Sequence, residues 1–398
     1  PLFQQHSTDR RVHTTGHTEG NFFILRMRSI FRGLHQRIVY YTDMADFLLP
    51  HYTYPRITPT GDKSEVLYPN EMQLVLREAE QLGITWNNIP DGDVCTFTYG
   101  NHIEYIRKGI ASTNRLTGIW ICMNKTLTHS ILSDAHLPVP RGFSIFSDDS
   151  HEYRKKVFEA LTHPLVVKPW RGSHGKGVRP NIITLEEMNE WIDALFLNMP
   201  EGTGANKSSV LVEETAQGEE YRIIVTKEKV LAVMNRQPAS IVGDGSKTIQ
   251  ELIDEKNTDP LRNISEDLYP NIHPDDDMKR ILQKSNFTLE SIPMQETKVV
   301  LREISNVIAG GDAYDVTDEI HPTVAEIAVK AIQAIPGMSL VGLDFMTTDI
   351  TKDQSSQSHA IIEVNFAPQF DMHDIPMHGK KRNVAKAIVL LMFPELVQ

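Results

Sequence analysis

The spacing of apolar side chains alternates along the chain between a helical period and a strand-like one. Apolar residues three or four positions apart form one stripe over residues 71–82, 322–335 and 383–393, which predicts helices. Thr184 and Glu187 have the spacing of a capping box and predict the start of a further helix. Shorter apolar or alternating runs predict strands at 97–106, 119–123, 165–167, 210–214, 221–225, 230–235, 339–346 and 359–366.

Other segments carry weaker patterns. Residues 22–30 and 37–41 are expected to form a helix and a strand, and another helix is expected from Thr126. Residues 248–296 are polar and charged, which predicts helices and loops on a surface. Within them, the acidic run 275–277 fits a solvated turn or a helix start better than a metal site, because consecutive carboxylates cannot easily converge on one ion.

A glycine-rich loop in residues 166–178 is the first candidate site. A short strand ends at Lys168, and Gly172, Gly175 and Gly177 follow it. Successive bare N–H groups beside a lysine are what a phosphate chain needs. Taken alone, an ordinary surface turn explains the loop equally well. The loop has neither the Walker A order nor the Rossmann spacing, so a phosphate site here belongs to another architecture.

An acidic pair of strands is the second candidate site. Asp344 interrupts an apolar strand, and strand alternation directs Glu363 and Asn365 to one side of another. If the two strands are neighbours, their oxygen atoms form one cluster, and Mg²⁺ prefers such ligands. The alternative is a solvent-facing edge strand, which the apolar neighbours on both strands make less favourable.

A charged hairpin is the third candidate. Glu213 and Glu214 end one predicted strand, Glu220 and Arg222 begin the next, and Arg236 follows on a third. Acidic groups there can bind ribose hydroxyls, and the guanidinium groups can bind phosphate or carboxylate. Read alone, an amphipathic hairpin with surface charge is the favoured interpretation.

Composition narrows the classes of partner and compartment. The chain has 398 residues and a net charge of −12, which argues against nucleic-acid binding, because that requires a basic surface. The only two cysteines, Cys95 and Cys122, exclude a disulfide framework and fit a reducing cytoplasm. No apolar run approaches the length that spans a membrane, so no membrane partner is expected.

The order of these motifs resembles the ATP-grasp carboxylate–amine ligases. The resemblance is nearest to the glutathione synthetase part of bifunctional γ-glutamate–cysteine ligase/glutathione synthetase, and cyanophycin synthetases carry a similar module. It runs from about residue 90 to the C-terminus. Besides the three candidate sites, these motifs carry it: Tyr99-Gly100, Glu104-Tyr105, Asn124-Lys125, 138–142, 235–239, 242–253, 256–262, Asn306, Gly310-Gly311 and 315–318.

The resemblance implies a fold and a division into domains. It implies an ATP-grasp fold, in which two α+β subdomains clamp ATP, preceded by an N-terminal α/β domain. The expected boundaries are an N-terminal domain at 1–115, a small ATP-grasp subdomain with the glycine-rich lid at 116–211, and a large subdomain with the metal and substrate site at 212–398.

The resemblance also implies roles for single residues. For ATP it implies that Lys125 and Lys168 lie at the phosphates and around the adenine. A mobile lid over the phosphates would contain Gly172, Ser173, His174, Gly175 and Gly177. Glu213 and Glu214 would lie at the adenine, and Glu220 would lie at the ribose. For the metal it implies Asp344, Glu363 and Asn365, which would bind two Mg²⁺ ions, with Mn²⁺ as a substitute.

The implied activity is an ATP-dependent ligation. An amide forms between the carboxylate of an amino acid or short peptide and an amine, through an acyl phosphate, with release of ADP and phosphate. Arg302, Asn306 and the Gly310-Gly311 turn would face the carboxylate and the developing oxyanion. Arg236 would contact the acyl phosphate or the substrate carboxylate. Two alternatives remain open: glutathione synthetase proper, joining γ-glutamylcysteine to glycine, and an ATP-binding regulator without catalysis.

The resemblance implies small-molecule partners, amino acids or peptides, and leaves a homodimer open. Residues 370–382 end in the basic trio Lys380, Lys381 and Arg382. This trio either binds an acidic substrate or is a basic turn before the last helix.

Overall fold

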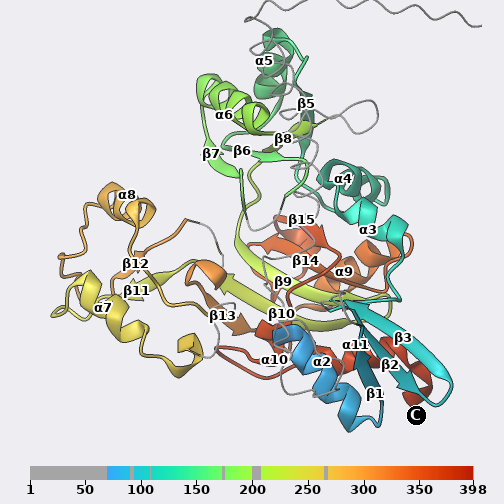
Figure 1. The fold of residues 1–398 in the computed structure, drawn as a ribbon. Coiled ribbons are helices and arrows are strands. Elements are labelled where there is room, and N and C mark those ends of the chain that lie inside the picture. The colour runs from blue at the N-terminus through green and yellow to red at the C-terminus, as the bar shows by residue number, and fades with distance from the viewer. Residues whose placement is uncertain are drawn as a thin grey trace, which may run out of the picture. The chain divides into compact units, whose positions relative to one another are not determined.

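The computed structural model describes residues 70–89, 94–107, 109–172, 175–199, 208–263, 268–303, 305 and 307–397. The described residues all belong to one compact unit, 67–398, and Figure 1 colours them along the chain. The helix and strand expected at 22–30 and 37–41 lie outside the described residues. The domain boundaries expected after residues 115 and 211 stay predictions.

The described chain begins with a helix and a small antiparallel sheet. Helix α2 (Asn70–Gln81) confirms the helix predicted at 71–82, and its buried face includes Val75 and Ala79. Gly100 turns the predicted hairpin, and the C-terminal helix α11 (Val384–Met392) shares the same core through Ile388. The sheet has its strands in the order β1 (Thr85–Asn88), β2 (Val94–Tyr99), β3 (His102–Arg107) and β4 (Ile110–Ala111).

A second four-stranded antiparallel sheet carries the glycine-rich loop. Its strand order is β5 (Gly142–Phe146), β8 (Ser209–Glu214), β6 (Leu165–Pro169) and β7 (Arg179–Ile182). Helices α5 (His151–Ala160) and α6 (Leu185–Asn198) pack on it and bury Val157, Met188 and Ile192. Thr184 caps α6 by accepting from the Glu187 N–H, whereas the Glu187 carboxylate accepts from the N–H of Ile183, so the predicted capping box forms only in part.

The central sheet holds the other candidate residues. Its five strands are all antiparallel to their neighbours, in the order β13 (Asp312–Asp315), β10 (Val230–Gln237), β9 (Glu219–Thr226), β14 (Leu340–Thr347) and β15 (His359–Asn365). One face buries Ile223, Val233 and Leu343 against helix α9 (Pro322–Ala334). This confirms the strands predicted around 221–225, 230–235, 339–346 and 359–366, and the helix at 322–335.

Helices α3 (Leu116–Cys122) and α4 (Lys125–Asp134) also pack into this core. The strand predicted at 119–123 is therefore wrong. Gly118 and Cys122 lie one helical turn apart and are both buried, and Met338 and the Pro336 carbonyl oxygen closely approach Gly118. A short, continuous apolar run is compatible with a buried helix as well as a strand, so its periodicity does not decide between them.

Residues 240–300 form a smaller group of elements with a core of its own. The two-stranded sheet of β11 (Ser240–Val242) and β12 (Lys298–Val300) packs with α7 (Ile249–Lys256) and α8 (Asp276–Lys284) around Ile253 and Met278. Asp275 caps α8 by accepting from the N–H of Met278, which confirms the helix-start interpretation of the acidic run.

Short helical turns complete the described part of the chain. They are η3 (Pro260–Asn263), η4 (Val307–Ala309), η5 (Gln354–Ser356), α10 (Asp371–Asp374) and η6 (Pro394–Leu396). Within the described residues, every helix is too short or too polar to cross a bilayer.

Gly218, in the turn before β9, provides a test of the fold. Its φ is +110°, and a Cβ there would collide with the backbone carbonyl of Thr347. We expect Gly218→Ala to destabilise the protein by about 2 kcal/mol or more, because backbone atoms must move. Gly100→Ala is the control: Gly100 has φ +58° but open space around it, so only the left-handed strain of about 1 kcal/mol applies. Urea unfolding should separate the two variants; equal losses would contradict this reading of the turn.

Candidate active site

A cavity of about 490 Å³ is lined by residues of both the β5–β8 sheet and the central sheet. Its size is that of a small-molecule site. Predicted residues in its lining are Lys125, Lys168, Gly172, Gly175, Glu213, Glu214, Glu220, Arg236 and Glu363. The cavity therefore brings together residues from all three candidate sites.

Lys168 lies at the end of β6 and is almost fully buried. Its Nζ lies 2.5 Å from Oε2 of Glu213, whose Oε1 lies 2.9 Å from Nδ1 of His129. Burial opposes ionisation of Glu213, but the Lys168 ammonium and His129 outweigh it and hold the pKa of Glu213 at about 2. Glu213 is therefore the buried counter-ion of the predicted phosphate-binding lysine.

The loop after Lys168 has the backbone that its glycines predict. Gly172, Gly175 and Gly177 have φ values of +138°, +71° and +74°, which side-chain-bearing residues rarely adopt. Ser173 and His174 lie outside the described residues.

Lys125 connects this loop to the acidic strands. It is the first residue of α4, and Asn124 caps the helix by accepting from the N–H of Leu127. The Lys125 Nζ donates to the carbonyl oxygen of Gly172 at 2.9 Å and to Oε1 of Glu363 at 2.6 Å. A predicted phosphate ligand thus lies against a predicted metal ligand.

Three of the charged residues form one row across the central sheet. In register, Arg222 on β9 pairs with Asp344 on β14, and Asp344 pairs with Glu363 on β15. Arg222 Nε lies 2.8 Å from Asp344 Oδ1, and Asn365 Nδ2 lies 3.4 Å from Asp344 Oδ2. This confirms that the two acidic strands are neighbours. Burial raises the pKa of Asp344, but Arg222 and Arg236 outweigh it, so the net shift is downward and the carboxylate is favoured.

Arg236 lies in the next row of the same face. It pairs in register with Glu220, donates to the Glu220 carboxylate, and lies 3.0 Å from Asp344 Oδ1. Burial raises the pKa of Glu220 despite the attraction of Arg236, and Asp344 raises it further. The residue expected at the ribose and the residue expected at the acyl phosphate are therefore direct partners.

The remaining predicted residues lie differently. Glu214 points away from Glu213, and its Oε1 accepts from the Thr162 N–H at 2.9 Å. Arg302 donates to both carboxylate oxygens of Asp275, at 2.7 and 2.8 Å, and is not among the residues that line the cavity. Asn306 lies outside the described residues.

Two residues of the charged network were not among the predicted site residues. Arg222 was recognised as a cation on a strand, but its partner Asp344 is distant in sequence. His129 was not predicted to take part in the site, yet it contacts both Glu213 and the carbonyl oxygen of Ile362. Both partners are acceptors, so a protonated imidazole satisfies both. The available signal was spacing: His129 follows Lys125 by four positions, on the same face of α4.

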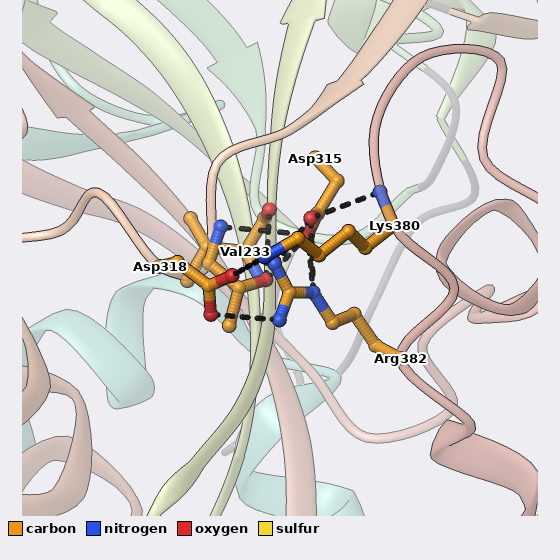
Figure 2. Close-up of polar contacts among 6 residues, drawn as sticks. Val233, Asp315, Asp318, Lys380 and Arg382 are labelled. Atoms are coloured by element: carbon orange, nitrogen blue, oxygen red, sulfur yellow. Dashed lines mark hydrogen bonds and ion pairs between the residues drawn. The ribbon is translucent and has the colours of Figure 1, made fainter.

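The basic trio at the end of 370–382 is largely neutralised within the chain. Figure 2 shows Arg382 between Asp315 and Asp318, with Lys380 also reaching Asp318. Arg382 Nε donates to both oxygens of Asp315, at 2.8 and 2.9 Å, and the Asp315 side chain is almost fully buried. Of the two interpretations, these contacts favour the structural turn over an acid-binding site.

The pair of Lys168 and Glu213 generates a prediction about stability. Glu213→Gln leaves Lys168 buried without its carboxylate, and we expect a loss of about 3 kcal/mol at pH 7. Because the folded-state pKa of Glu213 is depressed from 4.5 to about 2, its contribution is complete above 4.5 and falls as the pH drops toward 2. The wild-type protein should therefore lose stability more steeply than the variant over that range.

Urea unfolding at several pH values measures both effects. Glu214→Gln is the matched control, because that carboxylate is partly exposed and accepts mainly from a backbone N–H. Its cost should stay near 1 kcal/mol. Similar losses for both variants would contradict the assigned role of the buried pair.

The chain has relatives among known proteins, although no protein-family model matches it. The cyanophycin synthetase of Trichormus variabilis is 35% identical over 324 residues, which cover 81% of this chain and 35% of that protein. The glutathione biosynthesis bifunctional protein of Clostridium perfringens is 31% identical over 329 residues, which cover 81% of this chain and 40% of that protein. The chain thus spans little more than a third of the length of these curated relatives.

Among solved structures, a bifunctional glutathione synthetase from Pasteurella multocida matches with a TM-score of 0.63 and 28% identity, over 82% of this chain and 44% of that one. The fold, the order of the motifs and these relatives agree with one another. The chain therefore belongs to the ATP-grasp ligase family, as a homologue of cyanophycin synthetases and bifunctional glutathione biosynthesis proteins.

Proposed function

We propose that the protein is an ATP-dependent carboxylate–amine ligase, which forms an amide between an amino acid or short peptide carboxylate and an amine. One observation carries the proposal: Lys125 and Lys168, the cations suited to phosphate, line one cavity with Glu363, a carboxylate suited to a divalent cation. Use of ATP with a divalent cation is typical of the family, and the 490 Å³ cavity has the size for a nucleotide.

The nucleotide would bind with its phosphates toward the lysines. Lys125 and Lys168 would contact the phosphates, and the glycines of 172–177, with Ser173 and His174, would supply backbone N–H groups over them. Glu213 and Glu214 would lie near the adenine, and Glu220 near the ribose.

A divalent cation fits the acidic row. Asp344 and Glu363 are direct cross-strand partners, and Asn365 donates to Asp344 Oδ2, so three side chains with oxygen atoms occupy neighbouring positions on β14 and β15. Mg²⁺ prefers oxygen ligands and commonly retains waters beside nucleotide phosphates. When bound, the cation would neutralise charge that develops on the transferred phosphoryl group. We propose two Mg²⁺ ions, with Mn²⁺ as a substitute.

The chemistry follows from the weakness of a carboxylate as an electrophile. Its oxygen attacks the γ-phosphorus of ATP, the bond to ADP breaks, and an acyl phosphate forms. The amine then attacks the acyl carbon, loses a proton, and expels phosphate. We propose that Arg236 stabilises the acyl phosphate and its oxyanion by charge-assisted hydrogen bonds, with Asn306 as a further contact. Arg302 would have to leave Asp275 to take part.

The substrates would be amino acids or peptides. Among the relatives are proteins named cyanophycin synthetase and glutathione biosynthesis protein. For this reason γ-glutamylcysteine and glycine are one substrate pair to test. We place the reaction in the reducing cytoplasm, because Cys95 and Cys122 are both free thiols. A homodimer is compatible with this proposal.

Mass spectrometry of products tests the proposal directly. The protein is incubated with ATP, Mg²⁺ and a pooled library of amino acids and dipeptides that includes γ-glutamylcysteine and glycine. We expect ADP, phosphate and a new amide whose mass is the sum of two library members minus one water. Nucleotide binding without ADP or amide formation across the library would instead indicate an ATP-binding regulator.

Asp344→Asn tests the acidic row. The substitution keeps the shape but removes a charge that the cation requires, so we expect the rate of amide formation to fall by at least about 100-fold. Binding of Mg²⁺ in the presence of a non-hydrolysable ATP analogue, measured by calorimetry, should weaken in parallel. Asp318→Asn is the control, since Asp318 pairs with Lys380 and Arg382 away from the cavity lining. Rates unchanged in Asp344→Asn would exclude a metal role.

A further inference from the structure

A second cavity of about 440 Å³ opens beside the first. The two cavities share Gln237 and Lys298 in their linings, and Lys298 Nζ donates to Oε1 of Gln237 at 3.1 Å. The proposed function assigns no role to this cavity. Its lining comes largely from the elements around 240–262 and from β13: Ser240, Ile241, Val242, Leu252, Glu255, Lys256, Asp259, Arg262, Asp312, Tyr314, Met377 and His378.

The inner wall of this second cavity contains two cations and one carboxylate. Lys256 Nζ lies 2.5 Å from Asp312 Oδ2 and 2.7 Å from the carbonyl oxygen of Ser240. Arg262 donates to Asp312 Oδ1 at 2.7 Å and to the Pro270 carbonyl oxygen at 3.2 Å. Arg262 and Asp312 are 2% and 6% exposed and pair with each other, whereas the Lys256 side chain is 23% exposed.

Among the described residues, Lys256, Arg262 and Asp312 together carry one more positive charge than negative. Burial lowers the pKa of Lys256, and Asp312 opposes that shift without cancelling it. Arg262 Nε is also buried without a hydrogen-bond partner among the described residues. Lys256 and Arg262 share the single carboxylate of Asp312. An anion in the cavity would supply Lys256 with a counter-charge of its own.

The carboxylates at the rim of the second cavity have partners of their own. Glu255 lies 2.7 Å from Lys247, a surface lysine outside the lining, and Asp259 accepts from the N–H of Leu261. Lys298 adds a further cation where the two cavities meet. Cations therefore lie both on the inner wall and where the two cavities meet.

We propose that this second cavity is a carboxylate-binding subsite of the ligase, with Lys256, Arg262 and Lys298 as its cations. The inference rests on the proposed function, because it assigns the subsite to a carboxylate of the amino acid or peptide substrate that does not react. Asp312 pairs in register with Gln237, the residue after Arg236, so the subsite adjoins the proposed reacting centre. Its lining contains no glycine, unlike the phosphate loop, which favours a carboxylate over a phosphate.

Succinate is the probe for this subsite, and its binding to the full chain is measured by calorimetry at constant ionic strength, without substrates. We expect saturable binding of succinate, none of its neutral isostere succinamide, and weaker binding of inorganic phosphate. Lys256→Met should weaken succinate binding by about tenfold or more, because a charge-assisted contact is lost while the Arg262–Asp312 pair stays balanced. Lys247→Met, which removes one positive charge from the same group of elements, should change it less than about twofold.

Lys298→Met provides a second variant at a surface side chain, in case Lys256→Met does not fold, and should also weaken succinate binding. Equal binding of succinate and succinamide, tighter binding of phosphate, or unchanged affinity in Lys256→Met and Lys298→Met would overturn the subsite. Because the binding assay needs no turnover, its outcome is independent of the mass spectrometry of reaction products. Lys256-dependent succinate binding in a protein that forms no amide would refute the ligase function and leave an anion site standing.

Discussion

The site depends on pairing charges that are removed from water. Lys168 with Glu213, Lys125 with Glu363 and Arg222 with Asp344 each join a cation to a carboxylate within 2.8 Å. Burying any one of these groups without its partner would be costly. The pairs constrain the elements that carry them, because each contact holds only while both remain in place. Two of these pairs, Lys168 with Glu213 and Lys125 with Glu363, form part of the wall of the proposed nucleotide cavity, whereas Arg222 and Asp344 are not among its lining residues.

The same pairs define what a ligand must supply. Under the proposed function, phosphate would replace the carboxylates as the ionic partners of the lysines. A divalent cation would replace the lysines and arginines as the partners of the carboxylates. If only one ligand bound, one residue of a pair would lose its counter-charge. For example, phosphate bound to Lys125 would leave Glu363 without a cation. Nucleotide and cation together replace both halves. The charge network therefore favours joint binding, which is a physical reason for a ligase to use the metal–nucleotide complex.

Local pattern predicts much of this fold and less of its site. The stripe at 71–82 and the alternation around Glu363 are decided by neighbours in sequence, so both were predictable. The run at 119–123 was not, because a short continuous apolar run carries no periodicity that separates helix from strand. The pairing of Arg302 with Asp275 was also out of reach, because it depends on how α8 and the chain after β12 come together. Sequence thus identified charged residues better than it identified their partners.

Helix α4 shows why those partners matter. Its first turn carries Lys125 and its second carries His129, four residues apart on one face. Lys125 contacts Glu363 of the central sheet and the loop at Gly172, whereas His129 contacts Glu213 of the other sheet. A shift of α4 would disturb the proposed metal and nucleotide contacts together. The helix, which contributes only one predicted ligand, is therefore the element that couples the two halves of the cavity.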